Sequence, residues 1–370
     1  MYIPKFSITS NILSSVGKID AAREVIEHAP LVPAWERRFR TEARAKIIHH
    51  GTHLEGNGLN LDEVEKVLES DTDYPKITGR DRDIQEVINY RSVMDYIDDL
   101  SAKLNNAVTH ITHPSSPITH YVPINEEQYK EIHRLTLNRL GGNNLPGEYR
   151  NVKVVIRNTA TGEITFRPPS PLEVPYALTE FFSWLNSEEG RRVHPLIRAG
   201  ILHYELVRIH PFTDGNGRAT RAMALLLLFL EGYEIKKFFS LEEYYDRNPG
   251  DYYDALKSVE ITGDLTGWLE YFILGIAIEF GRVKELVQKL SLDLKLKSVI
   301  GGKQIALSDR QIKLVEFIER HGTLGMKDAR DVLTSVSEDT ILRDLRDLVA
   351  KKLILKKGNT KGAKYYLGSN

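Results

Sequence analysis

The chain has 370 residues, enough for two or three domains, and its 41% hydrophobic and 27% charged residues are typical of a soluble globular protein. A net charge of −1 excludes binding of polyanions through overall charge, and the lack of cysteine excludes disulfides, thiolate catalysis and cysteine zinc sites. The N-terminus has no signal-peptide pattern, and the longest apolar run, at residues 222–230, is too short to span a bilayer. We therefore expect a cytoplasmic protein without a membrane partner.

Residues 1–123 are predicted to form a helical N-terminal region. Apolar residues recur at helical spacing over residues 35–53, and a long helix is expected over residues 81–108. Asn60 is followed three residues later by Glu63, which is the pattern of a helix N-cap with a capping box. The glycine-rich stretch 51–58 is predicted to be a turn, and on local grounds its Glu55 is only a turn carboxylate.

Residues 124–276 are predicted to form a second region. Helices are expected at 125–140, 171–186 and 194–209, and two strand-like runs at 152–156 and 164–167 flank a turn at 158–162. Two strands cannot form a core sheet, so their exposed edge could pair with an extended peptide. No second ligand stands at metal spacing from His194 or His203, so core or surface roles are expected for both.

Residues 210–221, with the sequence His-Pro-Phe-Thr-Asp-Gly-Asn-Gly-Arg-Ala-Thr-Arg, carry the clearest chemical signal. The Gly215-Asn216-Gly217 turn precedes an apolar helix expected over residues 218–230. Free backbone N–H groups and the positive end of the helix dipole therefore form an anion site at this turn. Arg218 and Arg221 are three residues apart, so both can reach one bound anion.

Two further side chains of this stretch fit phosphate chemistry. Asp214 is a hard oxygen ligand beside the anion site, as Mg²⁺ shared with phosphates requires. His210 is the group in this stretch whose pKa suits a general base near neutral pH. The residues therefore predict a polyphosphate site with an adjacent proton acceptor.

Residues 277–302 are predicted to be a helix and a linker, with the linker at 298–302. Residues 303–370 are basic, with fourteen Lys and Arg against nine Asp and Glu. Three expected helices and a hairpin resemble a winged helix-turn-helix domain, whose recognition helix would carry Arg343 and Arg346. Such domains bind DNA or proteins, and both partners remain open here because three aspartates share that helix: Asp339, Asp344 and Asp347.

The stretch 210–221 resembles the signature of Fic-domain proteins, His-x-Phe-x-Asp/Glu-Gly-Asn-Gly-Arg-x-x-Arg, at every position. The resemblance implies a mainly α fold: a helical regulatory region, a Fic-type helical core with a β-hairpin flap at 151–168 and a C-terminal winged helix. It also implies transfer of AMP from ATP to a Ser, Thr or Tyr hydroxyl of a target protein, with Mg²⁺ as cofactor. The flap would hold that unknown target, and a homodimer is left open.

The same resemblance implies roles for individual residues. His210 would be the catalytic base and Asp214 the metal ligand. Residues 49–57 resemble the family's inhibitory segment, in which Glu55 would pair with Arg221 and block the γ-phosphate; Gly51 stands where that segment has Ser or Thr. The nucleotide-binding set would be Gly215, Asn216, Gly217, Arg218, Ala219, Thr220 and Arg221, with Tyr252 and Tyr253 near the adenine.

Three other functions stay open at this point. The same site could remove AMP from a modified protein, with Glu55 orienting water. The chain could be a DNA-binding regulator that senses nucleotide, although the intact His210 argues against this. A metal hydrolase built on His210 and Asp214 is a weaker fit, since it leaves both arginines and the anion turn without a role.

Overall fold

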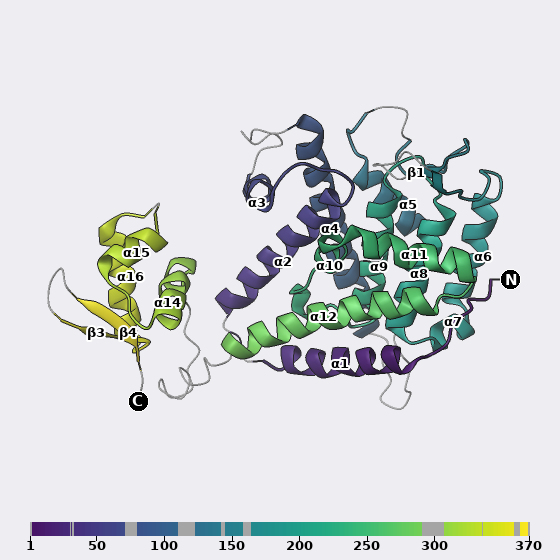
Figure 1. Ribbon diagram of the computed structural model, residues 1–370. Coiled ribbons are helices and arrows are strands. Elements are labelled where there is room, and N and C mark those ends of the chain that lie inside the picture. The colour runs from purple at the N-terminus through teal and green to yellow at the C-terminus, as the bar shows by residue number, and fades with distance from the viewer. Residues whose placement is uncertain are drawn as a thin grey trace. The chain divides into compact units, whose positions relative to one another are not determined.

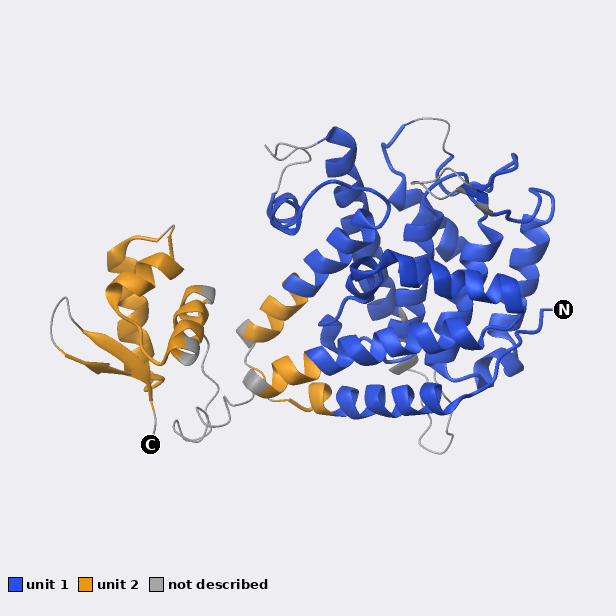
Figure 2. Ribbon diagram, viewed as in Figure 1, with its two compact units in different colours: residues 1–24, 42–282 blue, residues 25–41, 283–370 orange. Residues whose placement is uncertain are grey.

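The structure, a computed structural model, describes residues 2–29, 31, 33–70, 80–109, 123–141, 145–157, 164–290, 307–334, 336–358 and 363–368. The expected linker at 298–302 and the expected hairpin turn at 158–162 lie outside these residues. The chain divides into two compact units, residues 1–24 with 42–282 and residues 25–41 with 283–370 (Figure 2). The prediction of a mainly helical chain is confirmed, and no helix of the described parts is long and apolar enough to cross a membrane.

Helices dominate the chain up to residue 290 (Figure 1). In chain order the elements are α1 (Ser10–Glu27), α2 (Pro33–His53), α3 (Leu61–Glu69), α4 (Asp81–Thr109), α5 (Glu126–Thr136), β1 (Ile156–Arg157), β2 (Ile164–Phe166), α6 (Val174–Asn186), α7 (Glu188–Arg192), α8 (Pro195–Ile209), α9 (Asn216–Leu230), the 3-10 helix η1 (Ile235–Lys237), α10 (Leu241–Arg247), α11 (Pro249–Thr262) and α12 (Thr266–Leu290). The predicted capping box at Asn60 and Glu63 is confirmed at the start of α3.

Helix α9 is the centre of the first unit. Every residue of α9 except Gly217 is buried, because the helix packs against α8, α5 and α4 and is apolar on all sides from Ala222 to Leu230. On its far side α8 meets α12, where the Trp268 indole donates to the backbone carbonyl of Gly200 (2.8 Å). A Cβ at Gly200 would come within 2.7 Å of the Leu269 side chain, so the missing side chain lets the two helices approach closely. The start of α9 is thereby fixed by a rigid core.

The hairpin of β1 and β2 is shorter than the sequence indicates. The strands pair antiparallel, with Ile156 opposite Phe166 and Arg157 opposite Ile164. Residues 152–155 do not join the ladder. The start of this stretch is held by Arg150 instead, whose guanidinium donates to the carbonyls of Val152 (3.2 Å) and Pro169 (2.6 Å).

The second unit contains α14 (Asp309–His321), α15 (Met326–Val332), α16 (Glu338–Ala350) and an antiparallel pair, β3 (Ile354–Lys357) and β4 (Lys364–Leu367). Apolar residues of all these elements form its core, among them Ile318, Leu345 and Ile354. Ser308 caps α14 with a capping box. The order of helices and strands is therefore the one expected from the sequence.

Candidate active site

The loop between α8 and α9 is closed by its own side chains. The Asn216 carboxamide accepts from the backbone N–H of Phe212 and donates to the carbonyl of Phe212, both at 2.9 Å. Gly215 takes a left-handed conformation (φ 73°), and no side-chain hydrogen bond caps α9 behind it. The N-terminus of α9 is therefore presented at this loop without a side-chain cap, as an anion site requires.

His210 ends α8 in a left-handed conformation (φ 48°). Burial lowers the pKa of His210 to about 4, so its imidazole is neutral at physiological pH. Its Nδ1 is 3.3 Å from the Val207 carbonyl, which can only accept, so Nδ1 carries the proton. This tautomer leaves Nε2 with a lone pair for a proton from a substrate.

Phe212 and His133 pack together and stabilise the loop between α8 and α9. Phe212 is fully buried, and its ring stacks on the His133 imidazole with 3.5 Å between ring centres. The backbone N–H of Gly147 donates to His133 Nδ1 (2.9 Å), so Nε2 carries the proton and donates to the Asp214 carbonyl (2.8 Å). Sequence analysis missed His133, because nothing in its spacing links it to a loop 81 residues later.

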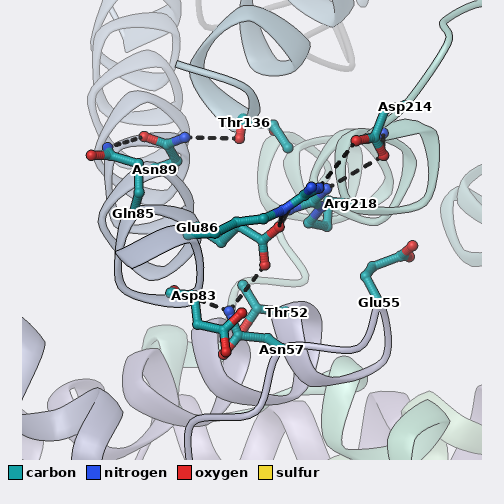
Figure 3. A network of polar contacts seen from close by, with 12 residues as sticks. Thr52, Glu55, Asn57, Asp83, Gln85, Glu86, Asn89, Thr136, Asp214 and Arg218 are labelled. Atoms are coloured by element: carbon teal, nitrogen blue, oxygen red, sulfur yellow. Dashed lines mark hydrogen bonds and ion pairs between the residues drawn. The ribbon is translucent and has the colours of Figure 1, made fainter. Parts of the chain in front are cut away.

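Arg218 points between carboxylates of two elements. Its Nη1 is 3.3 Å from Glu86 Oε1 on α4, and its Nη2 is 3.7 Å from Asp214 Oδ1 (Figure 3). Asp214 also pairs with Arg82 (3.5 Å), and its carboxylate accepts from the N–H of Gly215 (2.6 Å). The Arg218 side chain is almost fully buried. Its guanidinium is thus held in place before any anion binds.

Arg221 meets Glu55 directly. Nη2 of Arg221 donates to Glu55 Oε1 and to the Gly51 carbonyl, both at 2.9 Å. Burial opposes the charge of Arg221, but the Glu55 carboxylate holds the pKa of this guanidinium above its ordinary value. A Cβ on Gly217 would collide with Oε1 of Glu55, so this carboxylate lies against the glycine turn itself.

The end of α2, two residues before Glu55, is tied to α10. Nδ1 of His50 and Nδ1 of His53 lie 2.7 Å and 2.8 Å from the two carboxylate oxygens of Asp246. The Thr52 hydroxyl donates within its own helix, to the carbonyl of Ile48 (2.8 Å). These residues were not assigned a role from the sequence, since Asp246 follows them by nearly 200 residues.

Packing explains why a glycine stands at position 51. A Cβ at this position would come within 2.6 Å of the Tyr90 ring, which lies fully buried on α4. The residue that departs from the inhibitory segment of the Fic family is therefore the one that lets α2 and α4 approach.

Comparison with known proteins agrees with this geometry. Residues 123–228 match the model of the Fic/DOC family. This part of the chain is therefore similar to a Fic domain. It is 29% identical over 217 residues to a protein adenylyltransferase Fic of Culex quinquefasciatus, covering 58% of this chain and 38% of that protein. The Drosophila melanogaster protein of the same name is 30% identical over 198 residues, covering 53% and 35%. The match therefore spans less than two fifths of the length of these curated relatives.

Solved structures show the same fold. A Fic family protein from Desulfovibrio desulfuricans G20 superposes with a TM-score of 0.64 at 22% identity, covering 100% of this chain and 99% of that one. Residues 134–508 of Fic-1 from C. elegans give a TM-score of 0.57 at 25% identity, covering 75% and 73%.

Not every residue of the expected nucleotide set faces the Fic site. Ala219 and Thr220 are fully buried, and the Thr220 hydroxyl is 3.1 Å from the Tyr129 hydroxyl. Tyr252 is also buried, with its hydroxyl 2.9 Å from His203 Nε2, whereas Tyr253 is 50% exposed. The ring of Tyr253 is therefore the more accessible to a ligand.

Proposed function

We propose that this protein transfers AMP from ATP to a hydroxyl side chain of a target protein and that Glu55 restrains the reaction. Nε2 of His210 takes the proton of the hydroxyl, whose oxygen attacks the α-phosphorus. The bond from that phosphorus to the bridging oxygen of the β-phosphate breaks, and pyrophosphate leaves. The observation that carries this proposal is the neutral His210 imidazole beside the uncapped start of α9 and two buried arginines.

The charges around the loop support a nucleotide with Mg²⁺. Arg218 and Arg221 would offset the negative charge of the phosphates. No group of three or more metal-ligating side chains occurs among the described residues. Asp214, whose side chain is 36% exposed, offers the single carboxylate that Mg²⁺ bound to nucleotide phosphates uses. Asp214 would hold Mg²⁺ there, and the ion would add positive charge against the phosphates.

The flap supports a protein as the acceptor. Val152, Val155 and Ile164 are exposed apolar side chains next to the short hairpin. An extended segment of the target could pair with this edge through main-chain hydrogen bonds, while these side chains cover its flanks.

Replacement of His210 tests the reaction. His210→Ala should lower AMP transfer about 10²- to 10⁴-fold, while ATP binding measured by calorimetry persists. The assay is the intact mass of the protein and of cell-extract targets after incubation with Mg-ATP. His321→Ala, at the end of α14, is the matched control and should leave transfer unchanged. Transfer by His210→Ala at the wild-type rate would refute the proposal.

We further propose that residues 303–370 bind duplex DNA. The charges of α16 favour DNA over a protein partner, because two of its aspartates are paired. Arg310 of α14 donates to Asp344 (2.7 Å), while Gln311 and Lys351 contact Asp347. Exposed basic residues remain on α16 and on the strands, namely Arg343, Arg346, Lys356, Lys357 and Lys364; Lys361 lies outside the described residues.

A salt series with the full chain tests DNA binding. Affinity should fall with a slope of roughly −0.9 per phosphate contacted. Arg343→Gln/Arg346→Gln should make this slope shallower by about two contacts. The control Arg191→Gln/Arg192→Gln, on α7, should keep the wild-type slope. Lack of binding at low salt would refute the DNA proposal and favour docking of a protein.

A further inference from the structure

A small cavity lies behind Arg221, on the side of the core. Arg221 and Glu242 line it together with Tyr245, His203 and leucines of α9. Glu242 belongs to α10 and is 2% exposed, and Arg221 is 3% exposed. Arg221 therefore pairs with the partly exposed carboxylate of Glu55 and shares the wall of a cavity with the enclosed carboxylate of Glu242.

Several polar atoms of this cluster have no hydrogen-bond partner in the part of the chain that the structure describes. They include Nε of Arg221, Oε2 of Glu242, the hydroxyl of Tyr245 and Nδ1 of His203, all of which belong to residues lining the cavity. The cavity has a volume of about 10 Å³, enough for one water, and most of its lining is apolar. The free oxygen of Glu242 and the free N–H of Arg221 are an acceptor and a donor, so a water in the cavity can link them.

Near neutral pH, Glu242 is the one described group of this cluster that changes charge. Burial raises the pKa of Glu242 to about 7, against the opposing effects of Arg221 and the Ser240 hydroxyl. Burial also lowers the pKa of His203 to about 3, and it raises the pKa of every tyrosine facing the cluster: Tyr90 on α4, Tyr245 on α10 and Tyr252 on α11. These partners all stay neutral near pH 7, while Arg221 stays charged.

We infer that Glu242 is a positioning residue that holds the Arg221 guanidinium from the core side and competes with Glu55 and with a nucleotide γ-phosphate for its charge. This inference rests on the proposed function of Arg221. When Glu242 is protonated and neutral, the full positive charge of Arg221 acts on its outer partner, which is Glu55 or the γ-phosphate. When Glu242 ionises, it offsets part of that charge, so both Glu55 and the phosphate are held less tightly.

The first test measures nucleotide affinity in a chain that lacks the outer carboxylate. With a non-hydrolysable ATP analogue, Glu55→Gly/Glu242→Gln should bind about tenfold more tightly than Glu55→Gly at pH 8.5, the size of one pKa unit of coupling. The two should bind equally at pH 6. Comparing variants at each pH cancels the titration of the nucleotide itself. Equal affinity of the two variants at both pH values would overturn the inference.

Glu279 provides a matched control. It is a buried carboxylate on α12 whose pKa is also raised to about 7 by burial, but its charged neighbours are Glu243, Arg247, Lys46 and Arg282 instead of Arg221. Glu55→Gly/Glu279→Gln should therefore bind the analogue like Glu55→Gly at both pH values. A gain equal to that of the Glu242 variant would mean that loss of any buried charge suffices, which would also overturn the inference.

A second test keeps Glu242 in place and needs no nucleotide. Coupling between two sites is reciprocal, so removal of Glu55 should lower the pKa of Glu242. Titration of the Glu242 carboxyl carbon by NMR should show this shift in Glu55→Gly relative to wild type. An unchanged pKa would refute the competition. Because this readout is independent of ATP, it separates failure of the inference from failure of the proposed transferase function.

Discussion

Loss of the Glu55 carboxylate should activate the protein, and the geometry sets the size of the effect. Glu55 Oε1 lies 2.9 Å from Nη2 of Arg221, and Glu55 is 29% exposed while Arg221 is buried. A hydrogen bond of this charged type contributes about 1.5–3 kcal/mol net. At about 1.4 kcal/mol per tenfold, a restraint of this strength corresponds to roughly 10- to 100-fold in rate. Glu55→Ala should therefore raise AMP transfer by that factor.

The assay follows AMP transfer with labelled ATP at saturating Mg²⁺, together with thermal unfolding. Activity and stability should change in opposite directions, because Glu55→Ala removes a counter-charge from a buried cation. Without nucleotide, the melting temperature of Glu55→Ala should be a few degrees below that of wild type. ATP should raise the melting temperature more in the variant than in wild type. Glu55→Gln keeps the shape and should give a smaller activation. Glu69→Ala, an exposed carboxylate on α3, should change neither quantity.

A transfer rate that stays flat or falls in Glu55→Ala would refute the restraint. In that case removal of AMP, with Glu55 orienting water, becomes the better explanation. Incubation of an AMP-modified target without ATP would then reveal hydrolysis by the wild type and none by the variant.

The remaining predictions concern the base, the turn of α2 and the tether to α10. Burial lowers the pKa of His210 to about 4, so its base form persists as pH falls. We therefore expect kcat/KM to stay level from pH 7 to 5 and to drop only toward pH 4. A fall of kcat/KM centred near pH 6.5 would contradict this. Gly51→Ser should cost about 1–3 kcal/mol through overpacking against Tyr90, whereas Gly17→Ser, which meets open space on α1, should not destabilise; denaturant unfolding compares them. Asp246→Asn removes the partner of both histidines at the end of α2 and should raise basal transfer several-fold, with Asp254→Asn on α11 as a neutral control; unchanged transfer would mean that the tether does not contribute.

The parts of the site that sequence predicts best are those encoded by neighbouring residues. The turn before α9 follows from two glycines and an apolar run, and the cap of α3 follows from Asn60 and Glu63. Both depend on contacts between residues a few positions apart. The pairing of Glu55 with Arg221 spans 166 residues, and it was expected solely because the segment resembles that of a known family.

The supporting residues could not be predicted in this way. Glu86 holds Arg218, Arg150 donates to the His210 carbonyl (2.8 Å), and Asp246 holds the end of α2. Each is a single polar residue on an element far away in the chain, and no periodic pattern marks it. The hairpin was also predicted too long, because strand propensity at residues 152–155 does not reveal that Arg150 contacts both Val152 and the carbonyl of His210.

The burial of Arg221 links the proposed restraint of AMP transfer to the stability of the fold. Its position on an otherwise apolar helix buries a guanidinium that always carries charge, and such a group is costly to leave without a counter-charge. Without nucleotide, Glu55 supplies that charge from outside the core. A bound γ-phosphate would supply the same charge at the same place, so the two exclude each other. In the proposed reaction, the residue that would restrain transfer is thus also the one that makes a buried arginine tolerable before ATP binds.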